Sequence, residues 1–302
     1  MSENEKHKLS FENLYYKLAE KGITFNNISK DRVIEILQDR NYYYRIASYR
    51  KNFRKDSNNE YINLDFSTLE DLASIDVYLR EYLLSLCIDI EHITKTLLMR
   101  DITYNSEEDG YKIVERFSNI YFERYQKINS NFSKSLYLKD MYNKRRDKPI
   151  WVFLEIMSLG DLSLLLELYV DIYNISYKPL KQLSDNLRYV RNIRNTCAHN
   201  NVFLINLYSR KDNKINTPSQ YANSIRGLYN IDIINILYVK PHDLLVLFNL
   251  HKSLCSQELN NRRKREGQKV LDRVHKNYHK YKGQSEDLDN FFEYLNNLID
   301  IL

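Results

Sequence analysis

The sequence predicts an all-helical (all-α) fold, and three observations support this prediction. The chain of 302 residues contains only 6 glycines and 4 prolines, fewer than strand-and-turn proteins of this size usually need. Apolar residues recur every three or four positions over long stretches. The most regular stretch is 67–100, where Leu69, Leu72, Ile75 and Leu79 begin a single aliphatic stripe.

The first sixty residues predict a small helical unit. Short amphipathic helices are expected at 11–21 and 29–38, with a turn at Gly22 between them and Ser29 as the N-cap of the second. The polar stretch 56–63 resembles a linker. We therefore expect an N-terminal helical extension over 1–63 and a main helical domain over 64–302, which includes basic C-terminal helices.

The segment 41–53, NYYYRIASYRKNF, is both aromatic and basic and allows two interpretations. In the first, its tyrosines and Ile46 pack the segment onto the body of the protein. In the second, Arg45, Arg50 and Lys51 contact RNA phosphates while the tyrosines stack on bases.

The stretch 67–100 should form the longest helix, with Ser67 and Glu70 as a capping box at its start. Further helices are expected at 109–126 and 131–146.

Residues 149–173 predict two apolar helices. Pro149 is typical of a helix start, and Gly160 is the expected break between them. Trp151, the single tryptophan, is expected in the core. The carboxylate of Glu155 lies among apolar residues, so we expect it to pair with an arginine or to cap a neighbouring helix.

The last hundred residues predict more helices, at 218–226, 231–239 and 242–259, and an acidic amphipathic tail at 286–302 that folds back. Between them, the segment 262–282 carries nine Lys or Arg against Glu266 and Asp272. It is either a solvated helix face or a surface that follows an RNA backbone. The residues expected to bind RNA in the second case are Arg262, Arg263, Lys264, Arg265, Lys269 and Arg273.

Charge and cysteine content favour a cytoplasmic protein. The net charge of +5 permits an anionic partner without demanding one. The three cysteines are far apart, odd in number and not spaced as metal ligands, which is typical of a reducing compartment. The polar N-terminus lacks a signal-peptide core, and acidic residues interrupt the apolar stretch 150–170, so no contact with a membrane is expected.

The segment 188–206, RYVRNIRNTCAHNNVFLIN, combines three arginines, five asparagines and one histidine with helical apolar spacing. On a helix, Arg191, Asn195 and His199 form one stripe, whereas Arg194 points about 140° away from His199. For both to face one ligand, the helix must loosen near Thr196 or a second copy must supply the missing group. A purely structural, hydrogen-bonded helix end is the alternative.

The segment RNTCAHN resembles the R-x-x-x-x-H signature of HEPN-domain ribonucleases. Three further segments are similar to the Abi-like family of bacterial abortive-infection proteins, of the AbiD and AbiF type, and occur in the family's order: 41–53, 75–98 and 149–169. The resemblance covers roughly 11–206. Family members often carry a second histidine or a bulky residue after the signature, where this chain has Asn200 and Asn201.

The resemblance implies a HEPN-like helical bundle and a metal-independent endoribonuclease that needs no cofactor. Arg194 and His199 would be catalytic, with Asn195 and Arg191 in support. A histidine can take the proton of a ribose 2′-hydroxyl or protonate the leaving oxygen, and an arginine can stabilise charge on the phosphorus. Because HEPN ribonucleases usually pair two signatures and this chain has one, a homodimer is implied.

Two other functions stay open at this point. Some HEPN proteins are inactive partners, so an RNA- or nucleotide-binding module that does not cleave is an alternative. A toxin held inactive by an antitoxin is another, since some Abi-like proteins are associated with a structured noncoding RNA. In that case the segments 41–53 and 262–282 are the surfaces expected to contact the RNA.

Overall fold

The computed structural model describes residues 7–208, 214–215 and 217–302. Within this part of the chain the protein is all-helical and has no β-strand, which confirms the predicted fold class. The described residues form fourteen α-helices and three short 3₁₀ or π segments, η1 to η3. No helix among the described residues is long and apolar enough to cross a membrane.

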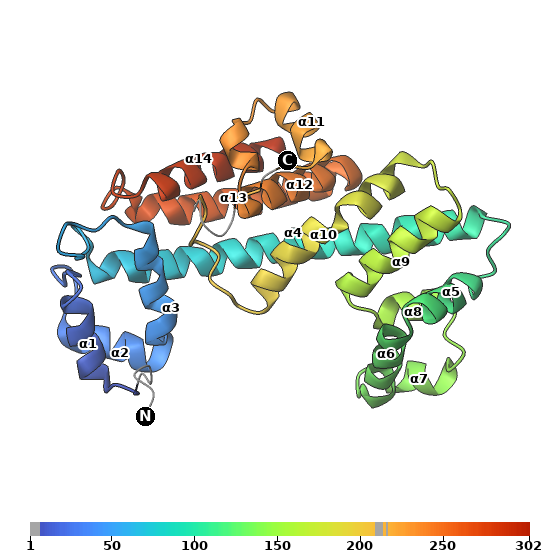
Figure 1. The fold of residues 1–302 in the computed structure, drawn as a ribbon, viewed down its shortest axis with the longest axis horizontal. Helices are drawn as coiled ribbons and strands as arrows, with labels where there is room; N and C mark the ends of the chain where they lie inside the picture. The colour runs from blue at the N-terminus through green and yellow to red at the C-terminus, as the bar shows by residue number, and fades with distance from the viewer. Residues whose placement is uncertain (1–6, 209–213, 216) are drawn as a thin grey trace.

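The longest helix, α4 (Phe66–Tyr104), is the axis of the molecule, and elements from both halves of the chain pack along it (Figure 1). The C-terminal helices α12 (Val239–Leu254), α13 (Gln257–Tyr278) and α14 (Glu286–Ile301) lie along one side. Helix α10 (Lys178–Ala198) crosses α4 and packs on both α4 and α12. These helices form the central bundle.

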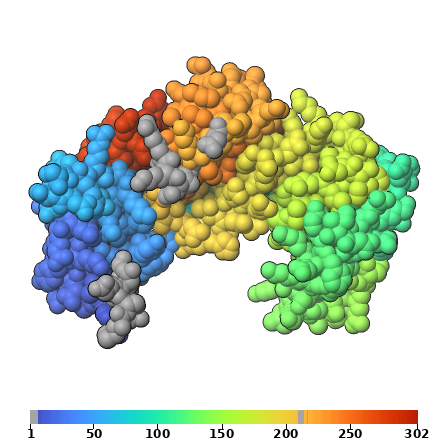
Figure 2. Space-filling view, in the orientation of Figure 1, coloured from blue at the N-terminus to red at the C-terminus, as the bar shows by residue number. Residues whose placement is uncertain are grey.

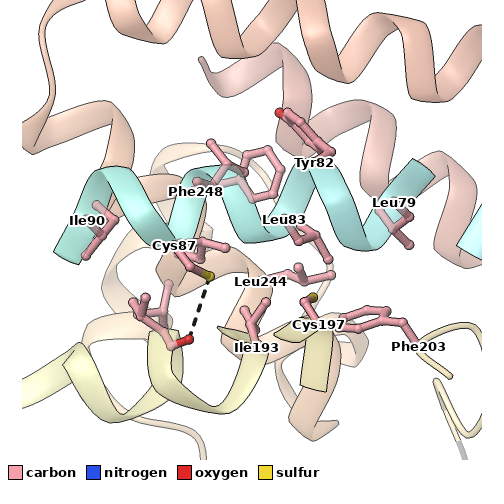
Figure 3. Close-up of a cluster of buried hydrophobic side chains, with 14 of the residues drawn as sticks. Leu79, Tyr82, Leu83, Cys87, Ile90, Ile193, Cys197, Phe203, Leu244 and Phe248 are labelled. Atoms are coloured by element: carbon pink, nitrogen blue, oxygen red, sulfur yellow. Dashed lines mark hydrogen bonds between the residues drawn. The ribbon is translucent and has the colours of Figure 1, made fainter. Parts of the chain in front are cut away.

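The core between these helices is apolar and tightly interleaved (Figure 3). Leu79, Leu83 and Cys87 of α4 belong to one buried cluster with Ile193 of α10 and Phe248 of α12, and all five side chains are at most 3% exposed. The Cys87 thiol also donates a hydrogen bond to the Val190 carbonyl across the α4–α10 contact. Burial of side chains of this size is the main stabilising contribution in a helical bundle.

Two smaller groups of helices project from opposite ends of α4 on the side away from α13 (Figure 1). The N-terminal group comprises α1 (Phe11–Ala19), α2 (Lys30–Glu35), η1 (Ile36–Arg40), α3 (Tyr43–Ser48) and η2 (Tyr49–Asn52). The other group comprises α5 (Lys112–Ile120), α6 (Phe122–Lys134), α7 (Lys139–Lys144) and α8 (Ile150–Ile156). Figure 2 shows the surface hollowed between the two groups.

The remaining elements are α9 (Leu159–Ile172), which packs against α10, and α11 (Gln220–Leu228) and η3 (Ile233–Ile236), which pack against α12. Most of the predicted helices therefore exist, although the stretch expected as 109–126 and 131–146 divides into α5, α6 and α7. Two predictions in the C-terminal part were wrong: the helix expected at 231–239 is only the four-residue segment η3, and the helix expected at 242–259 breaks after Leu254, before α13 begins. Ser29 caps α2 as predicted, since its hydroxyl accepts a hydrogen bond from the Arg32 amide. The proposed division at residue 63 stays a prediction.

Several local predictions were wrong. The N-cap of α4 is Asp65 and not Ser67, because the Asp65 carboxylate accepts from the Ser67 amide at 3.0 Å. The break expected at Gly160 lies earlier, where Ser158 caps α9. Trp151 is 50% exposed and does not belong to the core. Glu155 is exposed as well, so its charge needs no buried partner.

Candidate functional site

Helix α10 ends within the polar segment 188–206. The helix is regular through Thr196 to Ala198, so the first of the two alternatives, a helix that loosens near Thr196, does not apply, and a second copy stays a prediction. Asn200 has a φ of 57°, its amide donates to the Cys197 carbonyl, and the amide of Asn201 donates to the carbonyl of Thr196. These bonds form a Schellman ending, in which asparagine tolerates the left-handed conformation. The ending leaves His199 exposed at the C-cap.

The loop that follows His199 is held by a buried carboxylate of α4. Asp76 is completely buried and accepts hydrogen bonds from the amides of Phe203 at 2.8 Å and Leu204 at 2.7 Å. Its other oxygen accepts from Nε of Arg80 at 2.8 Å. A buried carboxylate needs such donors because an unpaired charge in the interior is very costly.

The same loop is held from two further elements. The Lys240 ammonium of α12 donates to the carbonyls of Phe203 at 2.7 Å and Ile205 at 2.6 Å, and burial lowers the pKa of Lys240 to about 8. The Asn52 side chain of η2 donates to the Leu204 carbonyl at 2.8 Å. The backbone after His199 is therefore fixed by side chains from η2, α4 and α12.

Asn200 joins α3, α4 and the end of α10. Its side-chain oxygen accepts from Nη2 of Arg45 at 3.1 Å and from Nη1 of Arg80. Arg45 and Arg80 are only 8% and 5% exposed. The expectation that Arg45 reaches an RNA phosphate is therefore corrected: its guanidinium is engaged with Asn200, and its role here is to position the loop.

A cleft of about 410 Å³ opens between α3, η2 and the end of α10. His199 shares it with Arg50 and Lys51, and the rings of Tyr42 and Tyr44 at its border are 63% and 78% exposed. The lining residues are Tyr42, Tyr43, Tyr44, Arg45, Ala47, Ser48, Arg50, Lys51, His199, Asn200, Asn201, Val202 and Ile205.

The packing interpretation of segment 41–53 holds for part of the segment, and the RNA interpretation stays a prediction for the rest. Ile46 and Tyr49 are fully buried and pack the segment onto the bundle. Tyr42 and Tyr44 are free of that packing, and Arg50 donates a long bond of 3.4 Å to the Tyr43 hydroxyl and also interacts with the Tyr61 hydroxyl. The cleft therefore offers a histidine, two cations and two exposed rings.

Arg194 does not line this cleft. Its Nε atom is buried without a hydrogen-bond partner among the described residues. Burial raises the pKa of the Cys87 thiol well above its usual value, and the nearby Arg194 guanidinium acts in the opposite direction. Arg191 lies across the first turn of α9, where a Cβ on Gly160 would be 3.4 Å from its Cδ. Neither Arg191 nor Asn195 lines the cleft.

The basic segment 262–282 lies largely on α13, and two of its cations are engaged inside the protein. Arg263 is 7% exposed and bonds both oxygens of Asp89, at 2.6 and 2.9 Å, while His251 approaches the same carboxylate at 3.0 Å. Burial alone would raise the pKa of Asp89, but hydrogen bonds from His251 and Arg263 outweigh it and lower the pKa to about 2. Arg273 is bonded to Asp71 at 2.7 Å.

The prediction that Arg263 and Arg273 bind RNA is therefore corrected, because their charges are already paired with Asp89 and Asp71. The other four members of the set keep accessible side chains: Arg262 and Lys264 form ion pairs at the surface, and Arg265 and Lys269 are exposed. Helix α13, which carries them, lies on the side of α4 opposite to the two projecting groups (Figure 1).

Sequence reasoning missed Asp76, Arg80 and Lys240. The spacing of Asp76 and Arg80, four residues apart within an apolar stripe, was a signal of a buried pair. Lys240 gave no such signal, since a lysine near the start of a helix usually lies in solvent.

The fold and the site define an all-helical protein with an exposed histidine in a cationic, aromatic cleft. A family model described as Abi-like protein matches residues 35–205, more than half of the chain, and the chain belongs to this family. All residues that line the cleft fall inside the matched segment. The family description points to a role in abortive infection. Searches of curated proteins and of solved structures give no match.

Proposed function

We propose that the protein is a metal-independent endoribonuclease of an abortive-infection or toxin-type system, with His199 as its acid–base group. One observation carries the proposal: His199 lies in the same cleft as Arg50, Lys51 and the exposed rings of Tyr42 and Tyr44. Cations and aromatic rings are the groups that bind single-stranded RNA, and an exposed imidazole can exchange protons near neutral pH.

The reaction that fits these groups is a transesterification within the RNA. His199 accepts the proton of a ribose 2′-hydroxyl, and the 2′-oxygen forms a bond to the adjacent phosphorus. The bond from phosphorus to the 5′-oxygen of the next nucleotide breaks, and that oxygen takes up a proton. The products are a 2′,3′-cyclic phosphate and a 5′-hydroxyl end. Arg50 and Lys51 stabilise the negative charge that builds up on the phosphoryl oxygens.

The position of Arg194 favours a homodimer, in which a second copy of the chain completes the site. Within one chain it does not share the cleft with His199, and the helix between them stays regular. In a homodimer, the end of a partner's α10 would bring another histidine toward the same RNA and provide the proton donor that one cleft lacks.

A specific observation favours the alternative of an RNA-binding protein that does not cleave. Among the described residues that line the cleft, His199 is the only imidazole and none is a carboxylate. A single chain therefore offers one acid–base group for two proton transfers. In this alternative the cleft holds a structured noncoding RNA through its cations and tyrosines.

The test is cleavage of end-labelled RNA by the purified protein in EDTA, with His199→Ala and with His92→Ala as the matched control, because His92 is an exposed histidine on α4. The proposal expects cleavage by wild type and by His92→Ala, and none by His199→Ala, which still binds RNA. Equal cleavage by all three proteins would place the activity elsewhere. Binding without cleavage by all three would leave the alternative.

A further inference from the structure

The group of helices at the C-terminal end of α4 carries exposed apolar side chains with no partner in the bundle. Leu136 and Tyr137, between α6 and α7, are 87% and 101% exposed, and Phe122 at the start of α6 is 61% exposed. Single exposed apolar residues are ordinary, but rings that stand free of any packing are available for a ligand.

The same segment is strongly basic. Residues 122–148, which we name the basic arm, contain eight Lys or Arg and three acidic residues, an excess of five that equals the net charge of the whole chain. Asp140 pairs with Lys144 at 2.9 Å, and Asp147 accepts from the Tyr111 hydroxyl at 2.8 Å. Lys134, Lys139 and Arg145 are exposed and form no ion pair with a described residue.

The basic arm and the His199 cleft lie on the same side of α4. Figure 1 shows the arm and the N-terminal helices projecting in the same direction, with the end of α10 between them, and Figure 2 shows the hollow that they border. Asn200 is bonded to Arg80, so the cleft lies at the level of that residue. From Arg80 to the end of α4 at Tyr104 is about 36 Å along the helix.

We propose that the basic arm is a second RNA-binding surface, which holds the backbone of the same strand that occupies the His199 cleft. The inference rests on the proposed function of the cleft. Cations interleaved with isolated rings are typical of surfaces that bind single strands, whereas the centre of a protein interface is depleted of charge. A stacked strand advances about 3.4 Å per nucleotide, so about 11 nucleotides would span the length of α4 from Arg80 to its end, near which the arm projects.

The arm therefore makes binding depend on RNA length. An RNA of four nucleotides fits the cleft and cannot reach the arm, whereas an RNA of about 20 nucleotides contacts both. Each phosphate that a cation neutralises contributes about 0.7 to the slope of log K against log salt concentration for a single strand. Three cations then account for a slope of about 2, and for roughly 50-fold in affinity at 0.15 M salt.

The experiment measures fluorescence anisotropy of labelled RNAs of four and 20 nucleotides, with every protein in the His199→Ala background so that no RNA is cut. The arm variant combines Lys134→Gln, Lys139→Gln and Arg145→Gln. The matched control removes three exposed lysines that lie outside the arm, Lys8, Lys181 and Lys214, by the same substitution. A second variant, Tyr137→Ala, removes a side chain that has no packing to lose.

The inference expects the arm variant to lose roughly 50-fold in affinity for the 20-nucleotide RNA, with a salt slope lower by about 2. Tyr137→Ala should lose about tenfold. Both should bind the four-nucleotide RNA within twofold of the parent, and the control should stay within about threefold on both RNAs. A control loss equal to that of the arm variant would overturn the inference in favour of a net-charge effect.

An unchanged affinity of the arm variant for the longer RNA, with normal binding of the short one, would overturn the arm and leave the cleft standing. If the affinity for RNA is unchanged and the arm instead binds a protein partner, the inference is overturned and the surface belongs to that partner. If the parent binds neither RNA, the proposed function and the inference fail together. A variant that instead removes Arg262, Arg265 and Lys269 and reproduces the loss would move the second surface to α13.

Discussion

Removal of the Asp76 carboxylate should destabilise the protein more than most single substitutions. Asp76 is completely buried and accepts three hydrogen bonds, from Arg80, Phe203 and Leu204. Asp76→Ala leaves the Arg80 guanidinium, itself 5% exposed, without its carboxylate, and loss of one partner of a buried ion pair costs about 3–5 kcal/mol. We expect the free energy of unfolding to fall by about 4 kcal/mol.

The protein offers a matched control. Asp140 and Lys144 form the same type of ion pair, four residues apart on a helix, but their side chains are 82% and 69% exposed. Asp140→Ala should change the free energy of unfolding by less than about 0.5 kcal/mol. Urea denaturation followed by far-ultraviolet circular dichroism measures both variants, because the fold is helical and the signal is lost on unfolding.

A double variant separates the ion pair from mere loss of volume. Asp76→Ala combined with Arg80→Met leaves no lone buried charge, so its cost should be smaller than the sum of the single costs by about 1–3 kcal/mol. If Asp76→Ala fails to fold, Asp76→Asn takes its place. It keeps the volume of the side chain and one acceptor oxygen, so its free energy of unfolding should lie between those of wild type and Asp76→Ala. A cost of Asp76→Ala below 1 kcal/mol, or equal to that of Asp140→Ala, would refute the reasoning.

Three further predictions concern other parts of the bundle. The lowered pKa of Asp89, about 2, contributes stability above its ordinary pKa near 4 that is lost as the pH falls toward 2. In urea unfolding at pH 5, the free energy of unfolding of wild type should therefore exceed that of Asp89→Asn by about 1–2 kcal/mol, after allowance for solvent screening. This difference should disappear near pH 2, and a difference that stays constant with pH would contradict the prediction. Gly267→Ala should destabilise the protein by about 1–3 kcal/mol, because the new Cβ would lie 2.8 Å from the Tyr82 hydroxyl. Gly227→Ala, whose new Cβ would have nothing within 4 Å, should stabilise it by up to about 1 kcal/mol. Thermal melts that rank the two variants the other way would disprove the close approach of Tyr82 to Gly267. Burial raises the pKa of Cys197 to about 12, so Ellman's reagent at pH 8 should react with this thiol only after unfolding, and rapid labelling of the native protein would show that the end of α10 opens.

Much of the fold could be predicted because helical periodicity is a local signal. The aliphatic stripe located α4 within four residues of its true end, since such a stripe can be buried only by a helix. Its first residue was less predictable. Asp65 and Ser67 are both residue types that cap helices well. In the structure Asp65 is the cap, and its second carboxylate oxygen accepts hydrogen bonds from Thr24 and Asn26, at 3.0 and 2.8 Å. These contacts join residues about 40 positions apart.

Gly160 shows the same limit for helix ends. A glycine commonly ends a helix, and the sequence offered no reason to prefer the serine two residues earlier. In the structure, Gly160 lies in the first turn of α9, where its missing side chain leaves room for Arg191 of α10. The glycine is explained by the close approach of a second helix and not by the backbone.

The candidate site was predictable in part. His199 was selected from the polar cluster at the end of an apolar helix, and Arg50 and Lys51 from the aromatic, basic segment. The sequence could not show that these residues share a cleft, because about 150 positions separate them and Asn200 makes the connection. It also could not distinguish Arg263 from Arg262, since the partner of Arg263 is Asp89 on another helix.

The central claim is that the 2′-hydroxyl attacks the phosphorus with the help of His199. The most direct measurement first maps one cut site in an RNA of 20 nucleotides and then compares that RNA with a copy that carries a single 2′-deoxyribose at the cut position. The account predicts that wild type cuts the first RNA to a 2′,3′-cyclic phosphate and leaves the second intact at that position, while His199→Ala cuts neither. Equal cutting of both RNAs by wild type would contradict it, because the nucleophile could not then be the 2′-oxygen.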